Sequence, residues 1–351
     1  MTEPVEIGAV VVGGGQAGLA TGYWLQRNDR SFVVLDRETE VGASWRRRWD
    51  SLRLFTPAGF SHLPGLRFPG PASAAPTKDE MADYLIAYAR HFALPVEPAT
   101  TVESVDPEGA HLLVTATDGR RWRARDVVLA TGAHTRPHLP GFAGRLDPAV
   151  VQLHSRDYRR PAQLPAGPVL VVGAGNSGAE IAADLAAGGR EVALSGRDVG
   201  HIPRLGPWTY PVMRLLGRPG AALARRGLGG GAEPLGRIRA GELEAAGVRR
   251  VPRTVGVRDG LPLLDDGSTC TVSAVVWCTG LRPDHRYVRV PVLDDAGRLV
   301  HRRGVTAWPG LYAVGLPHQS SITSHLVGGV GTDARRVVHH LARRPLARQR
   351  A

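Results

Sequence analysis

The chain has 351 residues, 43% of them hydrophobic, and a formal net charge of +12. This length allows two domains with a sizeable core, and no apolar run approaches the roughly 20 residues of a membrane span. The basic residues are almost all arginine, with Lys78 the single lysine, and few aromatic residues accompany them, which argues against nucleic-acid binding. Two cysteines, Cys270 and Cys278, and an acidic start unlike a secretory signal lead us to expect a cytoplasmic protein.

A strand–helix–strand pattern opens the chain. The apolar run Ile7–Val12 is typical of a buried strand and ends in Gly13–Gly18, which reads G-x-G-x-x-G. A helical pattern follows, then a second apolar run, Phe32–Leu35, which ends at Asp36. In such a unit the first glycine allows a tight turn, the second lets a pyrophosphate approach, and the third lets the helix pack on the strand. With a carboxylate placed to accept ribose hydroxyls, the pattern predicts a dinucleotide-binding fold.

The next segment supplies the remainder of this first fold. Residues 37–76 form a long irregular stretch whose apolar side chains favour a packed loop. Thr77–Glu80 is a capping box and predicts the start of a helix, with apolar residues of Met81–Tyr88 on one face. A hairpin turn is expected at Asp118–Gly119, and Asp126–Gly132 is expected to be a buried strand ending in a turn.

The opening pattern then recurs. Val169–Val172 runs into Gly173–Gly178, again G-x-G-x-x-G, and a helix and a strand near Glu191–Leu194 follow. Later, Ala274–Gly280 echoes Asp126–Gly132. We therefore predict an α/β protein with two dinucleotide-binding, Rossmann-like domains. The Arg- and Gly-rich segment 200–253 has no predicted function, although residues 235–247 could form an amphipathic helix.

One position distinguishes the two nucleotides. Asp36 lies 23 residues after Gly13, whereas the position 23 residues after Gly173 is Gly196, followed by Arg197. A carboxylate at this point binds a free ribose 2′-OH and repels a 2′-phosphate, and an arginine does the reverse. The sequence thus predicts FAD at the first site and NADPH at the second. Ser195 and Arg197 would hold the 2′-phosphate, with His201 a weaker candidate; a surface arginine beside an NADH site is the alternative.

On these motifs the chain resembles the flavin-containing monooxygenase family, nearest to its short bacterial and YUCCA-type members. The resemblance covers almost the whole chain and includes both fingerprints, the segment from Asp36 through Gly42 to Trp45, and two Thr-Gly linkers. Counterparts of the family pattern F-x-G-x-x-x-H-x-x-x-(Y/W) are Phe142, Gly144, His154, Ser155 and Tyr158. The resemblance implies an NADPH domain, residues 161–283, inserted into a discontinuous FAD domain of residues 1–160 and 284–351.

The resemblance also implies the chemistry. NADPH would reduce FAD, O2 would add at the flavin C4a atom, and this hydroperoxyflavin would oxygenate a small organic molecule by N- or S-oxygenation, Baeyer–Villiger insertion or oxidative decarboxylation. No side chain is assigned as catalytic and no metal is expected, because the chemistry is centred on the flavin; His154 and Tyr158 are candidates for positioning the linker or the nicotinamide. The expected cofactor-binding residues are Gly13, Gly15, Gln16, Ala17, Gly18, Asp36, Arg37, Trp45, Ala130, Thr131, Gly132, Gly173, Gly175, Asn176, Ser177, Gly178, Ser195, Arg197, Cys278, Thr279, Gly280 and Gly315.

Two other functions are compatible with the same motifs. The first is a NAD(P)H–flavin reductase that passes electrons to a protein or small-molecule acceptor; Cys270 and Cys278 are not spaced as C-x-x-C, which weakens its disulfide-reducing form. The second is a flavin-binding regulatory protein, which two intact fingerprints disfavour. The expected partners are a small-molecule substrate and O2, without nucleic acid or membrane. The sequence is also compatible with a homodimer.

Overall fold

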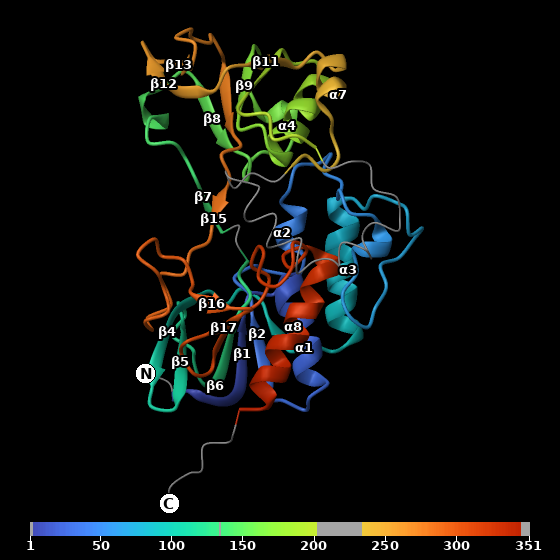
Figure 1. The fold of residues 1–351 in the computed structure, drawn as a ribbon, viewed down its shortest axis with the longest axis vertical. Helices are drawn as coiled ribbons and strands as arrows, with labels where there is room; N and C mark the ends of the chain where they lie inside the picture. Colours follow the sequence, from blue (N-terminus) through green and yellow to red (C-terminus); the bar gives the residue numbers. More distant parts are fainter. Residues whose placement is uncertain (1–2, 133–134, 202–233, 345–351) are drawn as a thin grey trace, which may run out of the picture.

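The computed structural model describes residues 3–132, 135–201 and 234–344. These residues form two main β-sheets, each with helices packed against it, and two short two-stranded ribbons (Figure 1). Figure 1 places one sheet above the other, with the short strands β7 (Arg136–Pro137) and β15 (Leu281–Arg282) between them. The two sheets correspond to the two dinucleotide-binding folds predicted from the repeated motif.

The larger sheet is built around a parallel core. Its strands lie in the order β18-β6-β1-β2-β3, all parallel; β17 and β16 extend one edge in antiparallel fashion, and β5 and β4 continue from β6 as an antiparallel meander. The strands of this sheet are β1 (Val5–Val12), β2 (Phe32–Leu35), β3 (Val96–Glu97), β4 (Val102–Glu108), β5 (His111–Ala116), β6 (Arg121–Leu129), β16 (His301–Arg302), β17 (Val305–Thr306) and β18 (Leu311–Ala313).

The smaller sheet is parallel throughout. Its order is β11-β10-β9-β14-β8, so the strand that leads into the second glycine motif, β9, is central. A two-stranded antiparallel ribbon of β12 and β13 accompanies it. The strands of this part are β8 (Val151–His154), β9 (Val169–Val172), β10 (Val192–Ser195), β11 (Arg249–Val251), β12 (Thr254–Arg258), β13 (Leu261–Leu264) and β14 (Ala274–Trp277).

Helices cover the sheets because the central strands are apolar on both faces. The last four residues of β1 and all of β9 and β14 are buried, as the continuous apolar runs predict. In Figure 1, α1, α3 and α8 stand side by side along the larger sheet, and the indole N–H of Trp24 on α1 donates to the carbonyl of Gly331 on α8 at 3.1 Å. The helices are α1 (Gln16–Gln26), α2 (Ala43–Arg46), α3 (Lys78–His91), α4 (Asn176–Ala187), α7 (Ala240–Ala245) and α8 (Val327–Ala342), with short 3-10 turns at Ala58–Phe60, Ala143–Arg145 and Pro161–Gln163.

Several local predictions are confirmed. The capping box is complete, since the Glu80 amide donates to the Thr77 hydroxyl at 3.2 Å and the Thr77 amide donates to the Glu80 carboxylate at 2.7 Å. β5 and β6 form the expected antiparallel hairpin, with Gly119 in the left-handed region at φ +86°. The long loop is packed as expected, because its apolar side chains Leu52, Leu54, Phe60, Leu63 and Phe68 are buried.

The expectation of a helix across residues 235–247 is only partly met, because α7 spans Ala240–Ala245 alone. The described residues before it, from 234 to 239, are not helical. The Gly236 amide donates to the side-chain oxygen of Asn176 at 2.7 Å, and Leu235 makes an isolated β-bridge with His201. Much of the Arg- and Gly-rich segment, residues 202–233, lies outside the described residues.

The connections between the sheets form a small structure of their own. β7 and β15 pair in antiparallel fashion, and we refer to this pair as the hinge ribbon. The expected boundary at residue 160 assigns β8 to the first domain, but β8 pairs with β14 in the smaller sheet. We therefore propose that the domains meet at the hinge ribbon. No helix in the described part of the chain is long and apolar enough to cross a membrane.

Candidate functional site

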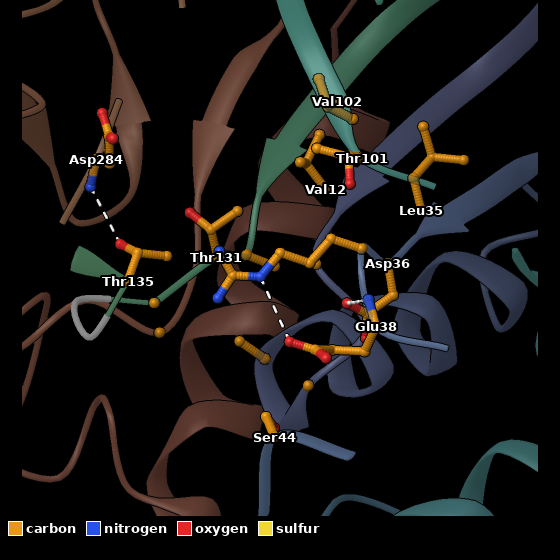
Figure 2. Close-up of a pocket in the computed structure, with 18 of the residues that line it drawn as sticks. Val12, Leu35, Asp36, Glu38, Ser44, Thr101, Val102, Thr131, Thr135 and Asp284 are labelled. Atoms are coloured by element: carbon orange, nitrogen blue, oxygen red, sulfur yellow. Dashed lines mark hydrogen bonds and ion pairs between the residues drawn. The ribbon is translucent and has the colours of Figure 1, made fainter. Parts of the chain in front are cut away.

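A cavity of about 480 Å³ runs along the carboxyl ends of the larger sheet (Figure 2). In Figure 2, Leu35 and Asp36 lie on one side of it, and Thr135 and Asp284 lie on the opposite side, joined by a 3.1 Å hydrogen bond from the Asp284 amide to the Thr135 hydroxyl. The cavity therefore extends from the end of β2 to the hinge ribbon. Ten predicted residues line it: Gly13, Gly15, Gln16, Ala17, Asp36, Arg37, Ala130, Thr131, Gly132 and Gly315.

The three glycines of the first motif differ in the space around them. A Cβ atom on Gly18 would lie 1.8 Å from the carbonyl oxygen of Gly13, and one on Gly13 would lie 2.8 Å from that of Ala130. These two glycines therefore allow close packing within the protein. A Cβ on Gly15 would meet no protein atom within 4 Å, so Gly15 instead leaves space beside the first turn of α1. The free amides and positive end of the α1 dipole at this point suit a phosphate.

At the β2 end of the cavity, burial raises the pKa of Asp36, an effect opposed by the hydrogen bond that its carboxylate accepts from the Glu38 amide. Beside it, burial disfavours ionisation of Glu38, but ion pairs with Arg47 and Arg37 lower its pKa overall. Asp36 pairs with no cation among the described residues, which leaves its oxygens available to ribose hydroxyls. The Asp36 carboxylate and the first turn of α1 thus line the same cavity.

Several residues of this cavity were not predicted from the sequence. Trp45 packs against the core and does not line the cavity, whereas Ser44 and Arg48 on either side of it do. The other lining residues come from loops that converge only in the folded chain, so no local motif identified them. They are Thr100, Thr101 and Val102 before and within β4, Thr135, Arg136 and Pro137 at the hinge ribbon, and Arg156, Asp284, Arg286, Tyr287 and His325.

The second motif reproduces the geometry of the first. A Cβ on Gly178 would lie 1.7 Å from the carbonyl oxygen of Gly173, and one on Gly173 would lie 2.3 Å from that of Cys278. A Cβ on Gly175 would again meet no protein atom within 4 Å. The side chain of Asn176, however, bonds to the Pro234 carbonyl at 3.3 Å as well as to the Gly236 amide, so it holds the neighbouring chain. The space beside Gly175 and the first turn of α4, which includes Ser177, is the second candidate nucleotide site.

Ser195, predicted to hold the 2′-phosphate, makes hydrogen bonds within the protein. Its side chain is fully buried, its hydroxyl donates to the Pro252 carbonyl at 2.9 Å, and it accepts a 2.7 Å hydrogen bond from the Thr254 amide. These bonds fasten β10 to the following chain, so in this conformation the hydroxyl does not face a ligand. Arg197 is exposed just beyond the end of β10, and the guanidinium group of Arg250 bonds to the Gly196 carbonyl at 2.9 Å.

Residues expected to lie near the interdomain linkers do so. The Nδ1 atom of His154 accepts a 3.1 Å hydrogen bond from the Arg156 amide, so its protonated Nε2 donates to the Gly280 carbonyl, also at 3.1 Å. The Thr279 hydroxyl donates to the His138 carbonyl across the hinge ribbon. Tyr158 is fully buried, and its hydroxyl bonds to the Asp184 carboxylate on α4 at 2.6 Å. These residues brace the linker, and neither His154 nor Tyr158 lines the cavity.

The bracing by His154 predicts a pH dependence. Burial lowers the pKa of His154, so the folded protein binds fewer protons at this ring than the unfolded chain, and its contribution to stability falls as pH drops below about 6.5. A glutamine can make both hydrogen bonds without titrating. We therefore expect the thermal midpoint of wild type, relative to that of His154→Gln, to fall as the pH drops from 7.5 to 5.5. A difference that stays constant with pH would contradict this role.

Comparison with known proteins agrees with this geometry. The profile of the pyridine nucleotide-disulphide oxidoreductase family matches residues 10–213. The chain is 39% identical over 346 residues to an uncharacterized CzcO-like oxidoreductase of Geobacillus kaustophilus, covering 95% of this chain and 98% of that one. It is 29% identical to the indole-3-pyruvate monooxygenase YUCCA1 of Oryza sativa, covering 93% and 89% of the two chains.

A solved structure extends the similarity to the whole fold. The flavin-containing monooxygenase of Stenotrophomonas maltophilia superposes with a TM-score of 0.78 at 31% identity, over 96% of this chain and 98% of that one. Both the two-domain α/β architecture and the paired glycine motifs are accounted for by this relationship. The chain therefore belongs to the flavin-containing monooxygenases, a family of FAD- and NADPH-using oxidoreductases, as its motifs predicted.

Proposed function

We propose that the cavity along the larger sheet holds FAD. The residues present fit this cofactor, because Gly15, the turn after it, Asp36 and Arg136 of the hinge ribbon line one cavity, and the space at Gly15 is open. Asp36 would accept hydrogen bonds from the ribose, and the first turn of α1 would bind the pyrophosphate. Thr131, Gly132 and Gly315 would then lie along the cofactor.

The proposed site for NADPH is the space beside Gly175, Ser177 and the end of β10. The single observation that separates the two nucleotides is the residue type after the second strand, a carboxylate in the first fold and Arg197 in the second. An arginine attracts the 2′-phosphate that distinguishes NADPH from NADH. The nicotinamide would extend toward the hinge ribbon, where the two folds meet.

The proposed activity is transfer of one oxygen atom from O2 to a small organic molecule. Bound FAD would supply the redox chemistry that links NADPH and O2 to the acceptor. The chain orients the two nucleotides, braces the linker through His154 and Thr279, and encloses the reacting end. The acceptor would undergo N- or S-oxygenation, Baeyer–Villiger insertion or oxidative decarboxylation. Within the described residues no group of side chains gathers to hold a metal ion.

The test of this function is product labelling. The protein is supplied with NADPH, 18O-labelled O2 and a panel of thioethers, tertiary amines, ketones and 2-oxo acids, and the products are examined by mass spectrometry. Incorporation of one labelled atom in any acceptor supports the proposal. NADPH oxidation that yields only reduced artificial acceptors or peroxide across the whole panel favours a reductase.

Replacing Arg197 by alanine is expected to weaken the binding of NADPH but not that of NADH. Loss of a charge-assisted hydrogen bond is worth about 1.5–3 kcal/mol, so the Michaelis constant for NADPH should rise by a factor of roughly 10 to 100. The Michaelis constant for NADH should change little, because NADH has no 2′-phosphate. The test is to measure initial rates with both nucleotides. A parallel change in the Michaelis constants for NADPH and NADH would show that Arg197 does not bind the 2′-phosphate.

A further inference from the structure

Arg48 is a cationic residue of the cavity that has no anionic partner among the described residues. Arg48 is partly buried and lines the cavity, yet within the described chain its guanidinium group forms no ion pair or hydrogen bond. Burial and the neighbouring guanidinium groups of Arg159 and Arg156 lower the pKa of Arg48, and no carboxylate offsets them. Like charges that lie close together in a partly buried site repel each other, and this is unfavourable unless an anion binds between them.

The second cation comes from the other domain. Arg156 follows β8 of the smaller sheet and also lines the cavity, and its guanidinium group donates to the Thr135 carbonyl at 3.3 Å. The segments that carry the two arginines are joined directly, since the Asp50 amide donates to the Arg159 carbonyl at 2.8 Å. Arg48 and Arg156 therefore meet where the two domains face each other, at the end of the cavity that lies by the hinge ribbon.

We propose that Arg48 and Arg156 together bind an oxyanion, a carboxylate or phosphate, at the seam between the two domains. The planar guanidinium group suits both anions, because two parallel N–H groups match two oxygens. The pyrophosphate of FAD already has the amide-lined turn at Gly15, so these arginines are free for another group. That group comes either from the carboxylate of an acidic substrate or from a phosphate on the nicotinamide side of NADPH.

The inference rests on the proposed function, since it assumes FAD in this cavity. FAD content and bleaching by NADPH in the wild-type protein test that assumption independently. The anion site is tested by titrating the FAD-loaded protein with benzoate, with its neutral counterpart benzamide, and with nicotinamide mononucleotide. The readout is the difference spectrum of the flavin, which requires no turnover.

We expect benzoate or the mononucleotide to bind, and benzamide to bind at least tenfold more weakly than benzoate if the carboxylate is the occupant. Arg48→Met and Arg156→Met should each lower the affinity for the anion about tenfold, because each removes one charge-assisted hydrogen bond. Arg48→Lys keeps the positive charge but lacks the two parallel N–H groups. Its affinity for the anion should therefore lie between those of wild type and Arg48→Met. Arg67→Met, an exposed charge removed from the same loop, is the matched control and should bind as wild type does.

The ligand that binds more weakly to the methionine variants identifies which molecule supplies the anion. A loss confined to benzoate assigns the site to a substrate carboxylate, and a loss that includes the mononucleotide, with a raised Michaelis constant for NADPH, assigns it to a cofactor phosphate. The proposal is overturned if neither anion binds wild type, or if the methionine variants keep FAD and bind both anions unchanged. It is also overturned if Arg48→Met and Arg48→Lys release FAD while Arg156→Met has no effect, because Arg48 would then be a FAD ligand alone.

Discussion

Gly15→Ala is expected to leave the fold intact and to remove most of the FAD. The residue has φ −77° and ψ −169°, which alanine adopts freely, and its Cβ would touch no protein atom within 4 Å. The methyl group instead occupies the space proposed for the pyrophosphate. Overpacking of a close contact costs about 1–3 kcal/mol, which corresponds to a factor of roughly 10 to 100 in affinity.

The measurement is FAD content after purification, followed by a flavin titration of the apoprotein, with thermal unfolding as the check on folding. Gly141→Ala is the matched control, because its Cβ also meets no protein atom within 4 Å and it lies outside the cavity lining. Gly18→Ala gives the contrasting result, because its Cβ would lie 1.8 Å from the Gly13 carbonyl and should destabilise the protein itself. A Gly15→Ala protein that retains FAD at wild-type affinity would place the pyrophosphate elsewhere.

Gly175→Ala is expected to show the complementary behaviour: normal FAD content and a large loss of NADPH binding. The backbone here is φ −75° and ψ −172°, and the added Cβ again meets only open space. The same steric argument gives a decrease in NADPH affinity of roughly 10- to 100-fold. The rate at which NADPH bleaches the bound flavin without oxygen, measured against NADPH concentration, reports this affinity directly.

The pair of variants separates the two sites. If Gly175→Ala releases FAD, or Gly15→Ala keeps FAD and loses only NADPH, the assignment of cofactors to the two folds is reversed. Arg197→Ala then provides an independent check, because it acts on the 2′-phosphate and not on the pyrophosphate. Agreement among the three variants would fix which nucleotide each fold binds.

The sequence allowed prediction of the parts of the site that are local in the chain. Each glycine motif, the strand before it and the helix after it lie within about 30 residues, the size of one supersecondary unit, so residue type and spacing determine the geometry. The turn at Thr131 and Gly132 was found because the buried run from Asp126 ends there, and Ala274–Gly280 repeats this pattern. The capping box at Thr77 and the hairpin at Gly119 are local for the same reason.

Contacts between distant segments were not predictable in this way. Arg48 and Arg156 are far apart in the sequence, and their approach depends on how the loop after α2 packs against the chain after β8. Ser195 has a suitable residue type and position for a phosphate, but its hydroxyl is bound by Thr254 and Pro252, which no pattern near β10 reveals. Trp45 was assigned to the cofactor by resemblance, whereas the structure turns its neighbours toward the cavity.

The most direct test of the central claim is a stopped-flow experiment on the FAD-loaded protein. The flavin is first bleached with NADPH in the absence of air and then mixed with oxygenated buffer while NADP+ is bound. We predict a transient that absorbs at shorter wavelength than oxidised flavin and lasts for seconds or longer, without immediate release of peroxide. A direct return to oxidised flavin with one peroxide formed per flavin, both with and without the acceptor panel, would contradict the monooxygenase assignment and favour a reductase.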